Sequence, residues 1–468
     1  MSSEFDFMSA SELRRRIARK DVSPVEITQR ALERAAAEQE RLNPFSLLLP
    51  DAALAAARDA EAAVVKGQAL GLLHGIPFSA KDLISVAGLK FEFGSRTMIG
   101  NVSAVDAPSV ARARAAGAIL IGKTTTSEFG CKPVGDSPLT GITRNPWNVD
   151  KTPGGSSAGA AASVAAGITP FALGTDGGGS IRIPCSFCGL AGLKGQFGRV
   201  AVWPVSATPT LAHVGPVART IEDAALLFAA VAGHDSRDPF TVAGPVPDVL
   251  AACRADVAGL RIAYSPTFGY ARPDADVVGV VSAAAAVFET LGCAVDPVEH
   301  LFDDPADLWT SEFYAGIGTS LRGFVEREPE LLDPAVAEIL RRALAQDLRS
   351  YYENVFARHA FRDHVRALFE RYDLLLSPVL PVASLAVGKN SPDHHDRGNP
   401  LTWVSYTYPF NLTGQPAATV CAGFGADGMP VGLQIVGRAF GEYDVVRAAA
   451  AFERTQPAGY NTIAAGKR

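Results

Sequence analysis

A serine that follows a run of glycines is the first feature of this sequence that could do chemistry. In GTDGGGSIRIP (174–184) three glycines, Gly177 to Gly179, lead directly into Ser180. Consecutive glycines allow several backbone N–H groups to point into one concavity, which is what an oxyanion hole requires. A serine hydroxyl is inert until a base removes its proton. The stretch therefore predicts a nucleophilic serine beside an oxyanion hole, with its base elsewhere in the chain.

Two further stretches could supply that base and its relay. TPGGSSAGAAAS (152–163) places Ser156 and Ser157 where a glycine-rich loop meets an alanine-rich helix, and backbone amides at a helix N-terminus favour negative charge. GIPFSAKDL (75–83) places Lys81 among apolar and small residues, and none of the eight histidines lies in the three stretches. Burial disfavours the ammonium form of lysine, so Lys81 is the candidate base.

Taken together, the three stretches resemble the amidase signature family of serine hydrolases. The resemblance rests on GIPxxxKD, GGSS and GTDxGGSIRxP followed by FCGxxGLK, which occur here in that order. It extends to TRNPWN (143–148), GPVARTIEDAALL (215–227), FNLTGQPA (410–417) and PVGLQIVGR (430–438). It covers most of the chain, although residues 235–400 carry little of it.

The resemblance implies a Ser–Ser–Lys triad. Ser180 would be the nucleophile, Lys81 the base, and Ser156, on a cis peptide typical of the family, the serine that relays the proton between them. The oxyanion hole would be formed by the N–H groups of Gly177, Gly178, Gly179 and Ser180. Support through hydrogen bonds is expected from Ser157, Thr175, Asp176 and Arg182. Hydrolysis would proceed through an acyl-enzyme, and no metal or cofactor is expected.

The family's pocket-lining stretch points to a substrate site. Phe129, Gly130 and Cys131 correspond to that stretch, and we expect Phe93 and Tyr314 to join them. These aromatic residues favour a hydrophobic substrate, unless the rings only pack in the core. The sequence departs from the usual family residues at Ala158, Gly177, Gly195 and Ala212. The two glycines among them leave the shape of the pocket open.

Other interpretations of the same residues stay open. GSSAG (155–159) also matches the G-x-S-x-G nucleophile elbow, with Ser157 as nucleophile, but the last histidine is His395 and no elbow context surrounds it. CSFC (185–188) has redox or zinc spacing, and DHHD (393–396) could bind a metal. Neither motif has a second ligand pair nearby, so we predict no metal site.

Composition bounds the class of protein. The chain has 468 residues, of which 48% are hydrophobic and 20% charged, and its net charge is −6. This balance favours a globular enzyme with a large core and offers no basic stripe for nucleic acid. The first residues lack the apolar core of a secretory signal, no apolar run approaches membrane-spanning length, and the six cysteines are sparse. We expect a cytoplasmic monomer or homodimer without a membrane partner.

Alternation of strand-like and helical patterns predicts an α/β fold. The runs at 117–126 and 169–179 indicate strands, 106–117 and the first 65 residues indicate helices, and 305–371 is almost wholly helical. The C-terminal stretch 418–437 indicates a β-hairpin. The resemblance implies a large, twisted, mixed and mostly parallel sheet between helical layers. We expect one domain over residues 1–468, with 305–371 as a helical cover over one side.

The predicted function is hydrolysis of the C–N bond of a hydrophobic amide, anilide or carbamate, with ester hydrolysis as a side activity. This describes an amidase, an aryl acylamidase or a urethanase. One alternative is the A subunit of a glutamine-dependent tRNA amidotransferase, which typically has glutamine where this chain has Ile183. Another is a non-catalytic binding protein of the same fold, which the presence of all three triad residues disfavours.

Overall fold

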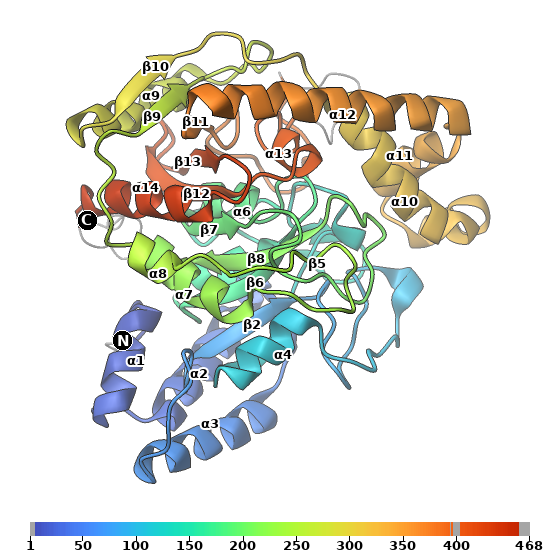
Figure 1. Cartoon of the computed structure of the whole chain (residues 1–468). Helices are drawn as coiled ribbons and strands as arrows, with labels where there is room; N and C mark the ends of the chain where they lie inside the picture. Colours follow the sequence, from blue (N-terminus) through green and yellow to red (C-terminus); the bar gives the residue numbers. More distant parts are fainter. Residues whose placement is uncertain (1–4, 394, 396–402, 458–468) are drawn as a thin grey trace.

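One large β-sheet organises the computed structural model, which describes residues 5–393, 395 and 403–457 (Figure 1). Its strands are β1 Phe45–Leu48, β2 Pro77–Lys81, β3 Ile119–Thr124, β6 Phe171–Asp176, β7 Ala191–Lys194, β8 His213–Ala218, β9 Arg261–Tyr264, β10 Ala294–Pro297, β11 Leu374–Pro378, β12 Ala417–Phe424 and β13 Pro430–Gly437. They form an 11-stranded sheet in the order β1-β3-β2-β6-β8-β7-β12-β13-β11-β9-β10. A separate two-stranded ribbon pairs β4 Asp136–Ser137 with β5 Gly141–Ile142.

The pairing of the strands is mixed. β2 runs parallel to both β3 and β6, and β9 runs parallel to β10 and β11. Between these two groups the neighbours are antiparallel, and β12 and β13 form the predicted hairpin. The predicted α/β class with a large mixed sheet is confirmed. The first 65 residues are less uniform than expected, because the short strand β1 lies between two of their helices.

Helices cover both faces of the sheet. The helices are α1 Ala10–Arg19, α2 Pro24–Leu42, α3 Pro50–Val65, α4 Pro108–Ala115, α5 Ala158–Ala165, α6 Arg182–Cys188, α7 Ile221–Val231, α8 Val249–Ala252, α9 Ala275–Thr290, α10 Ala306–Arg327, α11 Pro334–Leu344, α12 Leu348–Arg371, α13 Pro409–Leu412 and α14 Glu442–Arg454, with short 3-10 turns at η1 Arg96–Met98, η2 Glu128–Gly130 and η3 Pro329–Leu331. Side chains alternate between faces along a strand. In β6, Phe171 and Leu173 therefore join the core under α7 and α14, whereas Ala172 joins α5 and α6 on the other face.

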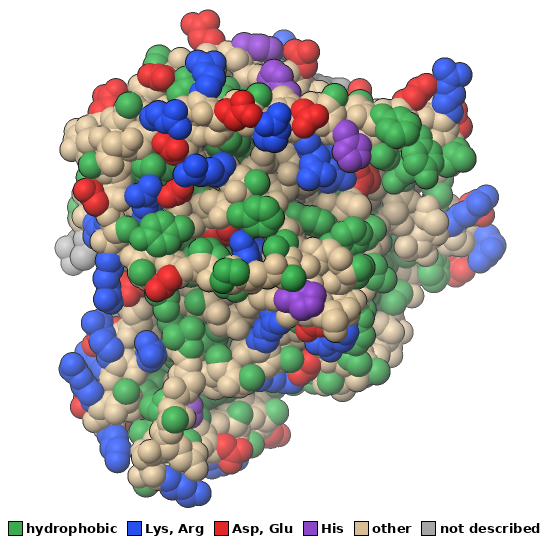
Figure 2. Space-filling model, viewed as in Figure 1, with side chains coloured by type: hydrophobic (Ala, Val, Ile, Leu, Met, Phe, Trp, Pro, Cys, Tyr) green, Lys and Arg blue, Asp and Glu red, His purple; other side chains and the backbone are tan. Residues whose placement is uncertain are grey.

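The predicted cover at 305–371 consists of α10, α11 and α12. α10 packs against both of its partners, and together they enclose a second hydrophobic cluster that includes Trp309, Phe313 and Leu340. In Figure 1, α12 extends across one end of the molecule, with α10 and α11 beside it. Figure 2 shows acidic and basic side chains interspersed over this face, and α12 itself carries the ion pairs Arg349–Glu353 and Arg366–Glu370.

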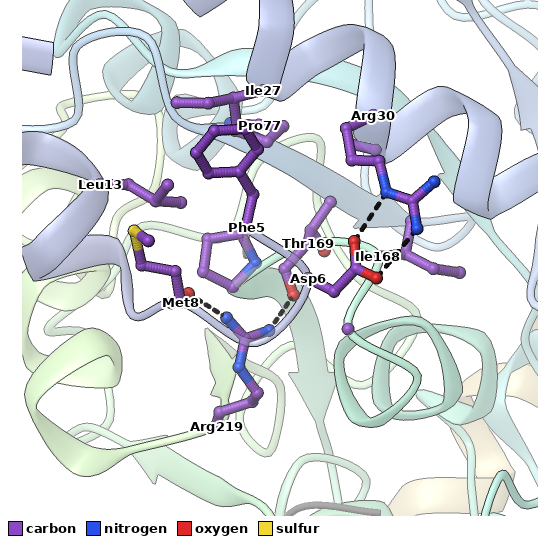
Figure 3. Close-up of a pocket in the computed structure, with 13 residues that line it drawn as sticks. Phe5, Asp6, Met8, Leu13, Ile27, Arg30, Pro77, Ile168, Thr169 and Arg219 are labelled. Atoms are coloured by element: carbon purple, nitrogen blue, oxygen red, sulfur yellow. Dashed lines mark hydrogen bonds and ion pairs between the residues drawn. The ribbon is translucent and has the colours of Figure 1, made fainter. Parts of the chain in front are cut away.

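A small hollow of about 20 Å³ lies where the N-terminal segment meets the sheet (Figure 3). The charged side chains that line it already have partners: Asp6 forms ion pairs with Arg30 and Arg34, both at 2.8 Å. Arg219 donates to the carbonyl oxygens of Thr169 and Met8 at 2.8 and 2.5 Å. These contacts hold the N-terminal segment in place. A hollow of this volume has no room for an organic substrate.

Several sequence expectations concern features outside the catalytic stretches. Within the described ranges, no helix is both long and apolar enough to cross a bilayer. The six cysteines are buried and free of disulfides. In the same part of the chain no group of three or more His, Cys, Asp or Glu side chains could hold a metal ion. His394 and Asp396 of the DHHD motif lie outside the described residues.

Candidate active site

The three predicted triad residues meet at one edge of the sheet. Lys81 is the last residue of β2, and the neighbouring parallel strand β6 ends just before the glycine turn that carries Ser180. Parallel strands place their carboxyl ends at the same edge, where sites of open α/β sheets form. Ser156 precedes α5 and lies against this edge, so that Lys81 Nζ is 2.6 Å from Ser156 Oγ.

Lys81 is a buried amine without a carboxylate partner. Its side chain is fully buried, and in the part of the chain that the structure describes Nζ donates to two hydroxyl oxygens, those of Ser156 and Thr175, the latter at 2.8 Å. Among the described residues no carboxylate lies within ion-pair distance of Nζ. Burial lowers the pKa of Lys81 well below its ordinary 10.5, and the more distant charge of Asp176 opposes this only in part. The neutral amine, which can accept a proton, is thereby favoured.

Ser156 occupies a confined position between Lys81 and the cavity. The Gly155–Ser156 peptide is cis, as the resemblance implied. Gly130 lies directly beside it: a Cβ at Gly130 would come within 3.2 Å of Ser156 Oγ and 2.9 Å of the Leu83 side chain. Glycine at position 130 therefore leaves space for the hydroxyl of Ser156.

Ser180 is half-buried and lines the same cavity as Ser156. Within the described part of the chain its hydroxyl has no hydrogen-bond partner, so the contact that would pass a proton from Ser180 to Ser156 is not formed in this conformation. Catalytic hydrogen bonds of ligand-free enzymes commonly tighten only when substrate binds. The hydroxyls of Ser156 and Ser180 line the same cavity. The Ser180 hydroxyl is free to donate its proton, as a relay requires.

The glycine turn supplies fewer free N–H groups than the sequence suggested. The Gly179 N–H donates to Asp176 Oδ1 at 2.7 Å, so it is already engaged. The N–H groups of Gly177, Gly178 and Ser180 have no acceptor among the described residues. Three of the four expected donors are therefore without an acceptor, and of their residues Gly177 and Ser180 line the cavity. The sequence could not indicate this, because it does not show that the carboxylate of Asp176 points back into its own turn.

A buried ion pair holds the base of this turn. Arg182 donates to both carboxylate oxygens of Asp176 at 3.0 Å, and also to Asn411 Oδ1 at 2.6 Å and Gln434 Oε1 at 2.8 Å. Burial alone would raise the pKa of Asp176, but the Arg182 guanidinium holds it below its ordinary range. Both side chains are fully buried, so the predicted supporting pair is a fixed structural unit under the turn.

Ser157 lies in the position of an N-cap for α5 but does not act as one. Its side chain makes no capping bond. Instead its hydroxyl donates to the Thr175 carbonyl oxygen at 3.1 Å and accepts from the Thr175 N–H at 3.2 Å. Ser157 thus ties the start of α5 to the end of β6, and in the described part of the chain its hydroxyl makes no hydrogen bond with Lys81.

A cavity of about 470 Å³ opens above Ser156 and Ser180. Its walls are mainly apolar and include the side chains of Phe91, Phe93, Phe129, Trp203, Phe313, Ile317 and Leu321. Phe93 and Phe129 stack with their ring centroids 5.5 Å apart. Among the described lining residues, only Asp176 and His213 carry titratable side chains. Burial lowers the pKa of His213 well below 6.5, which favours the uncharged ring.

The structure brings some of the predicted pocket residues together and leaves others behind the wall. Phe93, Phe129 and Gly130 line the cavity. Cys131 and Tyr314 do not: they are buried in the second hydrophobic cluster, where the Tyr314 hydroxyl donates to the Cys131 carbonyl oxygen at 3.1 Å. The sequence analysis missed the loop 201–208 and the α10 residues Ile317 and Leu321. Phe313, Ile317 and Leu321 are spaced four residues apart, and this spacing indicates that they share one face of a helix.

Comparisons with known proteins place the chain among amidases. The Amidase family model matches residues 26–446. An acylamidase of Rhodococcus erythropolis is 35% identical over 96% of both chains. The A subunit of the glutamyl-tRNA(Gln) amidotransferase of Methylococcus capsulatus is 36% identical over 92% of this chain and 93% of its own. The solved structure of a bacterial aryl acylamidase of the amidase signature family superposes with a TM-score of 0.92 at 28% identity, covering 100% of each chain.

Proposed function

The chain belongs to the amidase signature family, and on that premise we propose that it is a serine amidohydrolase for hydrophobic amides, anilides or carbamates, with Lys81, Ser156 and Ser180 as its catalytic residues. One observation carries the proposal. A buried lysine, with no carboxylate within ion-pair distance among the described residues, lies 2.6 Å from the hydroxyl of Ser156, and Ser156 and Ser180 line the same mainly apolar cavity. Such a lysine can act as a base.

The proposed reaction is a proton relay in both directions. Neutral Lys81 accepts the Ser156 proton while Ser156 takes that of Ser180, and Ser180 Oγ attacks the substrate carbonyl carbon. The negative charge that develops on the carbonyl oxygen is stabilised by the free N–H groups of Gly177, Gly178 and Ser180. Removing one such donor typically costs roughly 3–4 kcal/mol of transition-state stabilisation. Ser156 then protonates the leaving nitrogen, the C–N bond breaks, and water hydrolyses the acyl-enzyme by the same relay.

The cavity favours an uncharged, apolar substrate over glutamine. A free amino acid carries an ammonium and a carboxylate, and burying either without a partner is costly. Among the described lining residues, Asp176 is engaged by Arg182 and the uncharged ring of His213 is favoured. No lysine or arginine lines the same described wall. These features support the hydrolase over the amidotransferase component, although relatives of both kinds match the chain.

The proposal extends to where and with what the enzyme works. We place it in the cytoplasm, as one domain that acts on a small molecule without a nucleic-acid partner, as a monomer or homodimer. The net charge of −6 and the interspersed charges on the face shown in Figure 2 support the absence of nucleic-acid binding. Free buried cysteines suit a reducing compartment.

A matched pair of chromogenic substrates tests the proposal. We expect nitroaniline release from an acyl nitroanilide and from an N-(nitrophenyl) carbamate of similar size, and the ratio of the two rates distinguishes an amidase from a urethanase. Ser180→Ala should lower both rates by roughly 10⁴-fold or more, because the attacking oxygen is removed. Ser163→Ala is the matched control: this buried serine on α5 bonds only the Ala160 carbonyl oxygen, and its loss should leave both rates near wild type.

Two outcomes would contradict the proposal. Wild-type rates in Ser180→Ala would remove Ser180 as nucleophile. Release of ammonia from glutamine, with no release from either chromogenic substrate, would instead favour the amidotransferase component.

A further inference from the structure

The helical cover presses directly onto the glycine turn. A Cβ at Gly177 would lie 2.7 Å from Phe313 Cε2, and one at Gly178 would lie 2.5 Å from Trp309 Cζ2. Both aromatic residues come from α10, more than a hundred residues away in the chain. Side chains on the turn would therefore displace α10, and the glycines at 177 and 178 are explained by this close approach.

Each carbonyl group of the turn has its own anchor. The indole N–H of Trp309 donates to the Gly177 carbonyl oxygen at 2.9 Å. The Thr407 hydroxyl donates to the Gly178 carbonyl oxygen at 2.6 Å. The backbone N–H of Ile183 donates to the Gly179 carbonyl oxygen at 2.7 Å. All three peptide groups are thus fixed by their oxygens.

Fixing a carbonyl also fixes the direction of the next N–H. In a planar trans peptide the C=O of one residue and the N–H of the next point in opposite directions. The Gly178–Gly179 peptide illustrates this: its oxygen accepts from Thr407, and on its other side the Gly179 N–H donates to Asp176. By the same geometry the Trp309 bond turns the Gly178 N–H away from the indole, where it has no acceptor in the described part of the chain.

We propose that Trp309 is a positioning residue of the oxyanion hole: its indole N–H holds the Gly177–Gly178 peptide so that the Gly178 N–H is aimed at the substrate oxyanion. The inference rests on the function proposed above and extends it to a residue outside the three catalytic stretches. Trp309 acts through the peptide and does not touch the reacting atoms.

The indole is itself held rigidly. Trp309 is 4% exposed, and its ring stacks on Tyr408 and Phe313 at centroid distances of 5.4 and 4.8 Å. Donors that are fixed before the reaction need no reorganisation in the transition state. Because the same helix contributes Phe313, Ile317 and Leu321 to the cavity wall, α10 both contacts the substrate space and orients the turn.

Replacement of Trp309 by phenylalanine tests the inference, because it keeps an aromatic ring and removes the N–H. We expect the acylation rate and kcat to fall by about 10-fold to 100-fold while KM changes by less than about threefold. Trp147→Phe is the matched control: Trp147 also donates its indole N–H to a backbone oxygen, that of Cys188 at 3.0 Å, but does not line the cavity. It should keep wild-type kcat.

An oxyanion mimic separates positioning from general loosening. A trifluoromethyl ketone that forms a tetrahedral adduct with Ser180 should bind Trp309→Phe more weakly by a factor similar to the loss in kcat. The affinity of the uncleaved amide, measured in the Ser180→Ala background, should not change with the additional Trp309→Phe substitution. If Trp309→Phe fails to fold, benzothienylalanine at position 309 keeps the ring shape without the N–H, and the same split is expected.

The outcomes distinguish the inference from the proposed function. An active wild type, an inactive Ser180→Ala and a Trp309→Phe variant with wild-type kcat would overturn the inference alone. An equal loss of ground-state affinity and kcat would also overturn it, because Trp309 would then only support the structure. A wild type that hydrolyses no amide, or an active Ser180→Ala, would overturn the proposed function instead.

Discussion

Two lysines at the ends of adjacent strands have the same burial and opposite surroundings. Lys81 in β2 and Lys123 in β3 are both fully buried, and the strands run parallel with Ala80 in register with Lys123. Lys123 forms an ion pair with Asp82 at 2.9 Å and lies over the Phe91 ring at 4.9 Å. The Lys81 amine, within the described ranges, hydrogen-bonds only to hydroxyl groups.

The difference shows that the partner, and not burial, decides what a buried lysine can do. Burial lowers the pKa of both side chains, but at Lys123 the adjacent Asp82 opposes the shift strongly. At Lys81 burial lowers the pKa well below the ordinary value, and the charge of Asp176, which among the described residues is not within ion-pair distance, opposes the shift only in part. We therefore interpret Lys123 as a structural cation and Lys81 as a base.

The largest expected effect is on the acylation rate, in which the variants of the two lysines should differ. Lys81→Met should lower the acylation rate with an acyl nitroanilide by about 10³-fold, because general-base catalysis is lost. Lys123→Met should change it by less than about tenfold, through a shift of the Phe91 wall, as expected for a substitution outside the reacting groups. Single-turnover kinetics of both variants, beside wild type, measures this. Equal losses in the two variants would contradict the distinction.

The second effect is on the free energy of unfolding, which Lys123→Met should lower more than Lys81→Met. Lys123→Met leaves Asp82 buried without its partner, which should lower the free energy of unfolding by about 3 kcal/mol. Lys81→Met strands no charge and should cost about 1 kcal/mol or less. Urea unfolding of the single variants and of Asp82→Asn/Lys123→Met measures both. The double variant should recover part of the loss, and a double variant less stable than Lys123→Met would rule out the ion pair as the cause.

The smallest expected effect concerns Ser157, which we expect to lie outside the proton relay. Ser157 adjoins Ser156, but among the described residues its hydroxyl bonds only the backbone of Thr175. Ser157→Ala should lower stability by about 1 kcal/mol and leave kcat within a few-fold of wild type. Thermal unfolding together with anilide hydrolysis checks this. A loss of activity as large as that of Ser180→Ala would restore Ser157 as a nucleophile of the elbow type.

Local sequence predicted the elements whose signal is local. The apolar runs before the glycine turn and around residues 119–124 became β6 and β3, and the helical pattern at 305–371 became the cover. The four-residue strands β1 and β7 were missed, because so few residues carry no clear period. Asp82 follows Lys81 directly, but successive side chains near the end of a strand point apart. Asp82 therefore pairs with Lys123 on the next strand.

The parts of the site that sequence could not predict are contacts between distant segments. Trp309 and Gly177 are 132 residues apart, and nothing in either segment indicates their hydrogen bond. The same holds for Tyr314, which the structure places behind the cavity wall because its hydroxyl reaches the Cys131 carbonyl oxygen. The family motifs fix which residues gather at the sheet edge. The shape of the cavity depends on how α10 and the loop 201–208 pack over it.

The pH dependence of acylation tests the role of Lys81 most directly. Lys81 must be neutral to accept a proton, and burial lowers its pKa well below 10.5. The single-turnover acylation rate should therefore be constant at alkaline pH and fall on the acid side of a midpoint well below 10.5, as the amine is protonated. The residual rate of Lys81→Met should lack that fall. A rate that rises with a midpoint near the ordinary lysine pKa of 10.5, or an acid limb unchanged in Lys81→Met, would contradict Lys81 as the base.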